Sequence, residues 1–426
     1  MSASSWRVAL DPDLDAPAIA GALGPAVRFA MTILVRMADV SRAPRLISIE
    51  GAHIDSSLYM GEATLEFAER LVDLGARVKV PSTSNVSGVD VHGWQRWAVP
   101  PEWARQAYRQ MQAYQRMGCA PTWTCAPYQT SARPRFGQQI AWGESNAIAF
   151  ANTVIGARTE RYPDLMDICA AVTARVPDIG LHTDAGRAGR LSVRLREVPA
   201  ALQRDAAFWP VLGHVVGGLA GGLVPVVEGL DVQPTEDDLK AYCAAAASSG
   251  SVALSHLVGV TPEAPTAREA FHGRAPVGRR VVDMSLLRDA RRSLTTEPGD
   301  RVDLVVLGSP HFSVAEFATL APLLAGRRRH PDVRLLVTTS RIVADLARET
   351  GALQALEAFG GEVTVDTCIL TTPMLPSSIG SLMTNSAKYA YYAPGLLNAR
   401  VAFGSLVDCV ESAATGRVVR DDGPWQ

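Results

Sequence analysis

The sequence MGCAPTWTCAPYQTSARPRFGQQIAWGESNAIAFAN, residues 117–152, combines two of the chain's six cysteines, two tryptophans and a Glu-Ser-Asn triplet. Cys125 lies between two prolines, and since proline interrupts a helix, its surroundings are expected to form an ordered loop. From 140 to 151 apolar residues recur at helical spacing. Glu144 and Ser145 should therefore begin a helix beside the Cys125 loop, so that an acid, a hydroxyl and a thiol converge.

Length and charge indicate a folded protein with a small-molecule partner. At 426 residues, 47% of them hydrophobic, the chain can bury a large core and is long enough for two or three lobes. The formal net charge is only -2, and the basic residues are scattered instead of clustered. This pattern offers no electrostatic attraction for nucleic acid or for an anionic membrane.

The cellular compartment of the protein is inferred from targeting and disulfide patterns that the sequence lacks. The N-terminal residues lack the cationic and apolar segments of a secretion signal, and no apolar run is suited to span a membrane. The six cysteines follow no regular spacing, which argues against a disulfide scaffold. We expect a cytoplasmic protein with reduced thiols.

Two loops after expected strands are rich in small polar residues. A strand at 45–49 leads to a loop with His53, and a strand at 76–80 leads to one with Ser84 and Asn85. In open α/β sheets ligands bind beyond the carboxyl ends of the strands, so both loops could form one pocket wall. The alternative is that Ser, Asn and Gly simply form turns here.

Further along the chain, Arg158, Thr159 and His182 are candidates for substrate binding. A guanidinium group presents a planar pair of donors that suits a carboxylate. For His182 a purely structural role is the alternative reading.

The whole chain is expected to divide into an α/β lobe or lobes at 1–280 and a C-terminal α/β lobe at 281–426. Within the first range, residues at about 200–250 form an Ala- and Gly-rich helical module. In the C-terminal lobe apolar strands alternate with amphipathic helices. That alternation predicts a parallel sheet covered by helices on both faces.

Cys125, Cys368 and Cys409 could meet where the lobes join. Cys368 ends one expected strand. Cys409 lies near the start of the helix that follows the next expected strand. No CxxC pair is present, and on spacing alone a buried structural cysteine is the commoner outcome at each position.

Several segments in the same order resemble the large subunit of the aconitase X family. They cover most of the chain from about Leu46 to Gly416 and are VPSTSNVSGVD, PTWTCAPY, FGQQIAWGESNAIAFANTVIGARTERYPD, VVLGSPHFS, VDTCIL, MTNSAKYAYYAPG and GSLVDC.

The resemblance implies an aconitase-like fold with parallel sheets flanked by helices, and a hydro-lyase with an iron centre held by three cysteines. Carried over by motif, the metal ligands are Cys125, Cys368 and Cys409. The centre would be an iron-sulfur cluster or a mononuclear iron, and its nuclearity stays open. The substrates of the family are small hydroxy acids, cis-3-hydroxy-L-proline or mevalonate 5-phosphate.

The residue types suit removal of water. An iron with an open position takes up the charge of the leaving hydroxide, and donors around the substrate carboxylate stabilise an enolate-like charge. The expected catalytic residues are Glu144, Ser145, His53 and Lys388. The expected substrate-binding residues are Ser84, Asn85, Arg158, Thr159, His182, Asn385 and Ser386.

The base that abstracts the substrate proton is expected on another polypeptide. In aconitase-like enzymes a serine on a swivel domain abstracts the proton, and this sequence shows no such domain, so a separate small subunit is expected to carry it. Glu144 could instead orient a neighbouring group.

The sequence leaves alternatives for the substrate and for the functional class of the protein. The slightly acidic charge and the absence of a Gly-rich phosphate loop with lysine favour cis-3-hydroxy-L-proline over mevalonate 5-phosphate. A biosynthetic relative with another substrate, a non-catalytic subunit that retains the fold, and a Cys125 nucleophile with His53 or His182 as base are the other readings.

Overall fold

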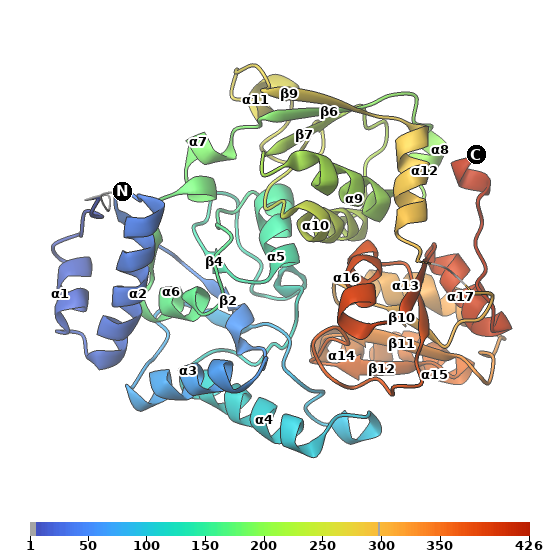
Figure 1. The fold of residues 1–426 in the computed structure, drawn as a ribbon, viewed down its shortest axis with the longest axis horizontal. Coiled ribbons are helices and arrows are strands. Elements are labelled where there is room, and N and C mark those ends of the chain that lie inside the picture. Colours follow the sequence, from blue (N-terminus) through green and yellow to red (C-terminus); the bar gives the residue numbers. More distant parts are fainter. Residues whose placement is uncertain (1–5, 297–298) are drawn as a thin grey trace.

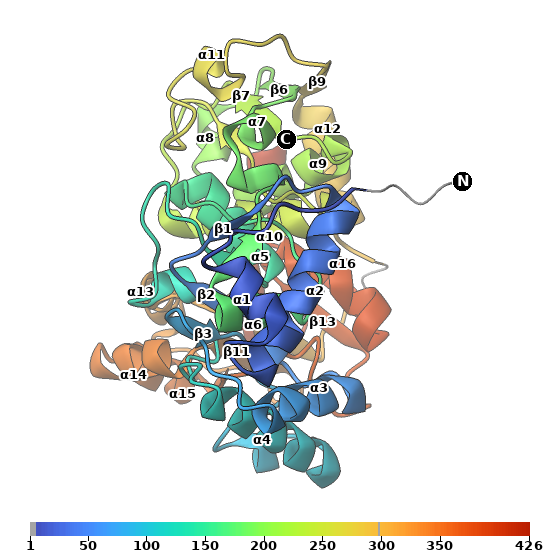
Figure 2. The same cartoon turned by 90° about the vertical axis from the view of Figure 1, so that its left-hand side faces the viewer.

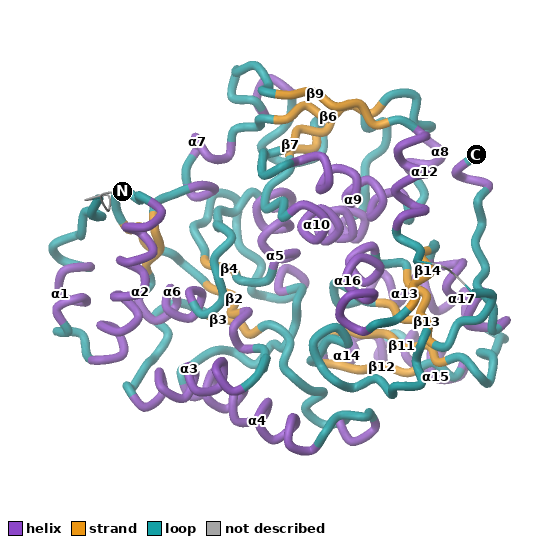
Figure 3. The backbone as a smooth tube through the Cα atoms, in the orientation of Figure 1, coloured by secondary structure: helices purple, strands orange, loops and turns teal. Residues whose placement is uncertain are grey.

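The computed structural model describes residues 6–296 and 299–426, which form four β-sheets surrounded by helices (Figures 1 and 3). Viewed from the side of α1 and α2, the strands β6, β7 and β9 lie at one end of the molecule and α3 and α4 at the other (Figure 2). Within these residues no helix is both long and apolar enough to cross a membrane.

The first part of the chain is built around a small parallel sheet of order β3-β2-β4, in which His53 of β2 pairs with Thr83 and Trp142. A separate antiparallel pair joins β1 to β5. The elements of this part are α1 (Asp15–Ala20), α2 (Pro25–Ser41), β1 (Leu46–Ser48), β2 (Ala52–Ile54), α3 (Glu62–Asp73), β3 (Ser82–Ser84), α4 (Pro101–Arg116), β4 (Ala141–Trp142), α5 (Ser145–Phe150), α6 (Met166–Thr173), β5 (Arg175–Pro177) and α7 (Asp184–Arg187).

The second part carries a parallel sheet of order β8-β7-β6-β9. Its elements are β6 (Leu191–Leu195), α8 (Ala200–Gln203), α9 (Phe208–Ala220), β7 (Pro225–Glu228), α10 (Glu236–Gly250), β8 (His256–Leu257), α11 (Ala267–Ala270), β9 (Gly278–Val282) and α12 (Met284–Ser293).

Small residues let α9 and α10 lie in close contact. A Cβ atom on Gly213 would stand 2.3 Å from the carbonyl oxygen of Tyr242, and one on Gly217 would stand 2.7 Å from that of Ala246. Only glycine allows backbones to approach so closely. The Ala- and Gly-rich composition of this region therefore serves helix packing.

The third part contains a five-stranded parallel sheet of order β12-β11-β10-β13-β14, with helices between its strands. This confirms the fold expected from the alternating pattern. Its elements are β10 (Leu304–Leu307), α13 (Val314–Leu324), β11 (Arg334–Thr339), α14 (Arg341–Glu349), α15 (Ala352–Phe359), β12 (Glu362–Val365), β13 (Ser381–Thr384), α16 (Ala387–Leu397), β14 (Arg400–Phe403) and α17 (Leu406–Thr415).

Two local expectations near the first sheet were wrong. Residues 76–80 form no strand, and the strand in this region is β3, at Ser82–Ser84. His53 lies inside strand β2 and not in the loop that follows. In β3 small polar residues form the strand itself, because its surroundings bury both faces and hydrogen-bond the side chains. In β2 the buried His53 bonds through Nδ1 to the Thr83 hydroxyl of that neighbouring strand.

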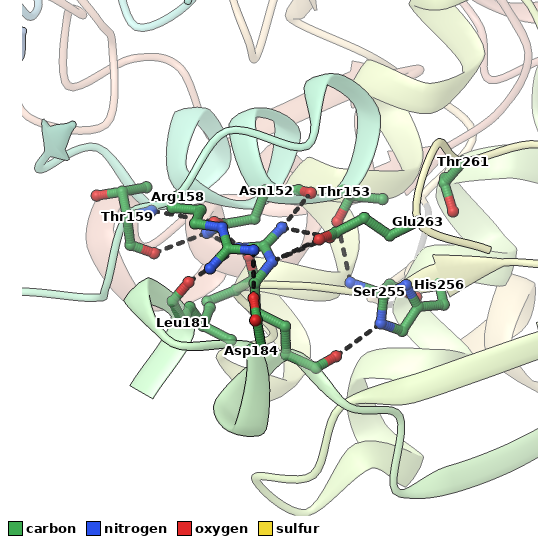
Figure 4. Close-up of polar contacts among 12 residues, drawn as sticks. Asn152, Thr153, Arg158, Thr159, Leu181, Asp184, Ser255, His256, Thr261 and Glu263 are labelled. Atoms are coloured by element: carbon green, nitrogen blue, oxygen red, sulfur yellow. Dashed lines mark hydrogen bonds and ion pairs between the residues drawn. The ribbon is translucent and has the colours of Figure 1, made fainter. Parts of the chain in front are cut away.

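Arg187 joins the first part of the chain to the second. Its side chain is 1% exposed, pairs with Glu263 and donates to the side-chain oxygen of Asn152 at 2.8 Å and to the carbonyl of Leu181 at 3.0 Å. Figure 4 shows Asn152, Leu181 and Glu263 within one cluster of polar contacts. A buried charge of this kind is stable only while every partner is in place.

We predict that Arg187→Met lowers the free energy of unfolding by about 3–5 kcal/mol, because Glu263 is left without its cation. Urea denaturation measures the change. The control Arg194→Met removes an exposed arginine of neighbouring strand β6 and is expected to change stability by no more than about 0.5 kcal/mol. Equal effects of the two substitutions would contradict this role for Arg187.

Candidate active site

A cavity of about 270 Å³ lies between the first and third parts of the chain. Pockets of this kind, with a few convergent polar groups, are typical of small-molecule sites. Its polar lining comprises Asp55, Asn85, Cys125, Glu144, Ser145, Arg161, Tyr162 and Asp164 from the first part, and Ser309, His311, Cys368, Thr371, Lys388 and Tyr392 from the third.

Glu144 and Lys388 form an ion pair on the cavity wall. Glu144 is the N-cap of α5, where its carboxylate accepts from the backbone N–H of Asn146 at 3.2 Å and from the side-chain amide of that residue at 2.7 Å. Lys388 of α16 donates to the same oxygen at 2.7 Å. Burial raises the pKa of Glu144, but Lys388 and these hydrogen bonds outweigh it and lower the pKa to about 2.

Asn85 contacts two carboxyl groups at once. Its side-chain N–H₂ donates to Asp55 and, at 3.2 Å, to Glu144, while its Oδ1 has no partner within the described residues. Burial, followed by the negative charges of Glu144, Asp167 and Asp164, raises the pKa of Asp55 well above its ordinary value. Ser145 lies beside this group and donates to Glu144 at 3.1 Å.

Cys125 and Cys368 both line the cavity. The backbone N–H of His311 lies 3.3 Å from the Cys125 sulfur. The His311 ring contacts the Thr124 hydroxyl at 3.1 Å through Nδ1 and the Thr367 carbonyl at 3.1 Å through Nε2. One histidine therefore holds the loops of both thiols.

A covalent nucleophile is not supported by this geometry. Burial raises the pKa of the Cys125 thiol to about 12, whereas reactive cysteines have lowered values. The Nδ1 atoms of His53 and His182 bond to Thr83 and Gln139, and neither imidazole lines the cavity.

Cys409 does not lie with the other two cysteines. It is fully buried on α17, in an apolar core with Val410 and Ala413, and it does not line the cavity. Across the described part of the chain, no group of three or more His, Cys, Asp or Glu side chains is arranged to hold a metal ion. Of the three expected thiols, the structure thus places Cys125 and Cys368 at the cavity and Cys409 in the core between α17 and the sheet.

His53 and Ser84 lie behind the cavity wall. Both are fully buried, and His53 Nε2 and Ser84 Oγ have no hydrogen-bond partner among the described residues. Burial, the largest influence, lowers the pKa of His53 to about 4, so the imidazole is neutral at pH 7.

Arg158, Thr159 and His182 belong to the polar network beside Arg187. The guanidinium of Arg158 donates to Asp184 and to the carbonyl of His182, and the Thr159 hydroxyl accepts from the backbone of Trp142 at 3.1 Å. Figure 4 shows Arg158 and Thr159 within this network. None of the three lines the cavity, since their donors are used in holding the chain together.

Asn385 and Ser386 also lie outside the cavity lining. Asn385 faces a different pocket, together with Arg204 and Ser405. Ser386 caps α16 by accepting from Tyr389 at 3.2 Å and donates to the carbonyl of Ser309. It positions the helix that carries Lys388.

Eight polar residues of the described lining were not among the expected site residues: Asp55, Arg161, Tyr162, Asp164, Ser309, His311, Thr371 and Tyr392. His311 and Ser309 lie in the segment VVLGSPHFS, where a strand end followed by polar residues was a usable signal. Arg161 stands three residues beyond Arg158, the arginine that the sequence favoured. Asp55 directly follows strand β2, two residues after His53.

Models of the aconitase X family match nearly the whole chain. The first-domain model matches residues 8–185, the second-domain model 189–292 and the third-domain model 302–415. These ranges coincide with the three parts of the chain that hold the separate sheets.

Known proteins resemble the chain over most of its length. A cis-3-hydroxy-L-proline dehydratase of Pseudomonas aeruginosa is 48% identical, over 95% of this chain and 70% of that protein. A phosphomevalonate dehydratase large subunit of Methanosarcina mazei is 35% identical, over 93% of this chain and 95% of that protein. The crystal structure of Thermococcus kodakaraensis aconitase X in its holo-form is 31% identical with a TM-score of 0.85, over 95% of this chain and 100% of that one. The chain belongs to the aconitase X family.

Proposed function

We propose that this protein is a dehydratase that removes water from a small hydroxy acid, with cis-3-hydroxy-L-proline as substrate. The observation that carries the proposal is the cavity of about 270 Å³ in which two thiols, the Glu144–Lys388 pair and Arg161 meet. It is supported by the 48% identity to the Pseudomonas aeruginosa dehydratase of that amino acid.

Arg161 is assigned to the substrate carboxylate. It is exposed at the cavity, and no carboxylate of the described residues forms an ion pair with it. Arg158, expected in this role, is already paired with Asp184. A guanidinium and a carboxylate form two parallel hydrogen bonds, which fix the orientation of the substrate.

Phosphomevalonate is the second candidate, because relatives with that activity are matched over 92–95% of their length. The cavity favours the smaller acid. Arg161 and Lys388 are its two lysine or arginine side chains within the described lining, and Lys388 is already neutralised by Glu144. A phosphate together with a carboxylate would require more cationic partners.

Cys125 and Cys368 are assigned to the iron-containing cofactor that the family implies, since sulfur donors suit iron. No third cysteine of the described residues lines the cavity, so the assignment is limited to these two. When bound, such a group supplies a Lewis acid for the substrate hydroxyl.

The proton-abstracting base is assigned to a serine on a separate small subunit. The support is that the chain matches 95% of a relative that is itself named a large subunit. Within this chain, Glu144 is poorly suited as a base, because its ion pair with Lys388 stabilises the carboxylate. Its role is to hold the ammonium group of Lys388 at the cavity.

We expect Cys125→Ala and Cys368→Ala to lose most of the bound iron and Cys409→Ala to retain it, because only the first two sulfurs reach the cavity. Iron per chain is measured by plasma mass spectrometry after anaerobic purification, with circular dichroism as a check of folding. Loss of iron from a folded Cys409→Ala variant would contradict this prediction and would indicate that Cys409 is an iron ligand.

Activity is expected to need a second polypeptide. The chain is mixed with the separately produced part of the Pseudomonas aeruginosa relative that it does not match. Mass spectrometry should then detect the loss of one water from cis-3-hydroxy-L-proline, with a much lower rate for mevalonate 5-phosphate. Full activity of the chain alone would contradict the partner, and preference for the phosphorylated substrate would contradict the substrate assignment.

Arg161→Gln is expected to raise KM roughly 10- to 100-fold, because a charge-assisted hydrogen bond contributes about 1.5–3 kcal/mol. The turnover number should change much less. The matched control is Arg158→Gln, which removes an arginine outside the cavity and should leave KM within about twofold. A larger increase of KM in the control would reverse the assignment of the two arginines.

A further inference from the structure

Asp55 is a cavity carboxyl group to which the proposed dehydratase reaction has so far assigned no role. It begins a short 3-10 helix, Asp55–Ser57, at the end of strand β2 and lines the cavity beside Asn85 and Gly143. A Cβ atom on Gly143 would stand 2.6 Å from the Asp55 Cβ, so a glycine at this position is needed for Asp55 to lie against the wall.

Asp55 and Glu144 have opposite environments although they share one donor, the amide of Asn85. Glu144 also receives the ammonium of Lys388 and the amide of Asn146. No cation of the described residues pairs with Asp55. Of two adjacent carboxyl groups, the one without a counter-charge holds its proton more tightly.

Other carboxylates strengthen this difference. The charged groups with the largest effect on Asp55 are Glu144, Asp167 and Asp164, and each raises its pKa. Asp167 is held by three hydrogen bonds, from the backbone and hydroxyl of Ser56 at 3.0 and 2.6 Å and from the backbone of Ile168 at 2.7 Å. It does not line the cavity, whereas Asp55 does.

Two other polar groups of the lining, Tyr162 and His311, are less suited to give up a proton. Tyr162 bonds to the ring of His182, and burial raises its pKa well above the ordinary value. The two ring nitrogens of His311 are committed to Thr124 and Thr367.

We propose that Asp55 is the proton donor to the leaving hydroxyl of the substrate. This rests on the proposed dehydratase function. The C2–H bond breaks, its proton passes to the small-subunit base, and its electron pair forms the C2–C3 double bond. The C3–O bond breaks with its pair on oxygen, which takes the Asp55 proton and leaves as water. Solvent then returns a proton to Asp55 and removes one from the base.

The test compares two leaving groups in the complex with its partner. For Asp55→Asn, kcat/KM for cis-3-hydroxy-L-proline is expected to fall about 100- to 1,000-fold, the usual contribution of a general acid. Elimination of chloride from cis-3-chloro-L-proline needs no proton donor and should stay within a few-fold. The decline of kcat/KM at high pH, which reports ionisation of the acid, should disappear.

The matched control is Asp167→Asn, a buried carboxyl group beside Asp55 but outside the cavity. It is expected to lower stability and, because its charge acts on Asp55 only through space, to change the ratio of the two elimination rates far less than Asp55→Asn does. An equal loss of both reactions in Asp55→Asn would overturn the proposal, since a residue that only positions others affects both leaving groups.

A measurement without substrate separates this proposal from the dehydratase function. Infrared spectra of protein with ¹³C-labelled aspartate should show an un-ionised carboxyl band at pH 7 that Asp55→Asn removes. If the band is present and no hydroxy acid is dehydrated, the proposed function fails while Asp55 remains a protonated acid. If the band is absent, Asp55 has no proton to donate and the proposal fails whatever the substrate is.

Discussion

The ion pair between Glu144 and Lys388 is the interaction on which the cavity depends. Its partners lie 244 positions apart in the sequence, one at the start of α5 and the other on α16, and their side chains are 13% and 12% exposed. Two charges that are largely removed from water stay ionised only if each keeps the other. The pair therefore joins the first and third parts of the chain at the cavity, and it also fixes which of the two adjacent carboxyl groups carries the negative charge.

The same two parts are joined again by His311, whose contacts hold the loops of both cavity thiols. Thr124 precedes Cys125 and Thr367 precedes Cys368, and each binds one side of the His311 ring. A neutral imidazole suits this task because it donates through one nitrogen and accepts through the other. Burial, the largest influence, lowers the pKa of His311 to about 4, so the ring stays neutral at pH 7.

The sequence predicted the fold better than the direction of individual side chains. Apolar strands and amphipathic helices alternate over 302–415, and this period is enough to predict a parallel sheet. Cys409 lies in a family-like segment, but the face of α17 that it occupies depends on packing against the sheet, which sequence alone does not specify. Arg158 and Arg161 differ in the same way: the first finds a local carboxylate and the second does not. Asp55 was missed because a single carboxyl after a strand resembles a turn residue until Glu144 is brought beside it.

The charges around the cavity link the binding of an acid to the proton on Asp55. Asp55, Glu144 and Asp164 are the carboxyl groups of the described lining, and Arg161 and Lys388 are its lysine and arginine side chains. With all of them ionised, the lining is already negative before a substrate carboxylate enters. That carboxylate adds a further negative charge, which disfavours ionisation of any acid nearby. By linkage, a proton on Asp55 favours binding of the hydroxy acid as much as the bound acid favours the proton. The donor would thus be most completely protonated in the complex in which its proton is needed.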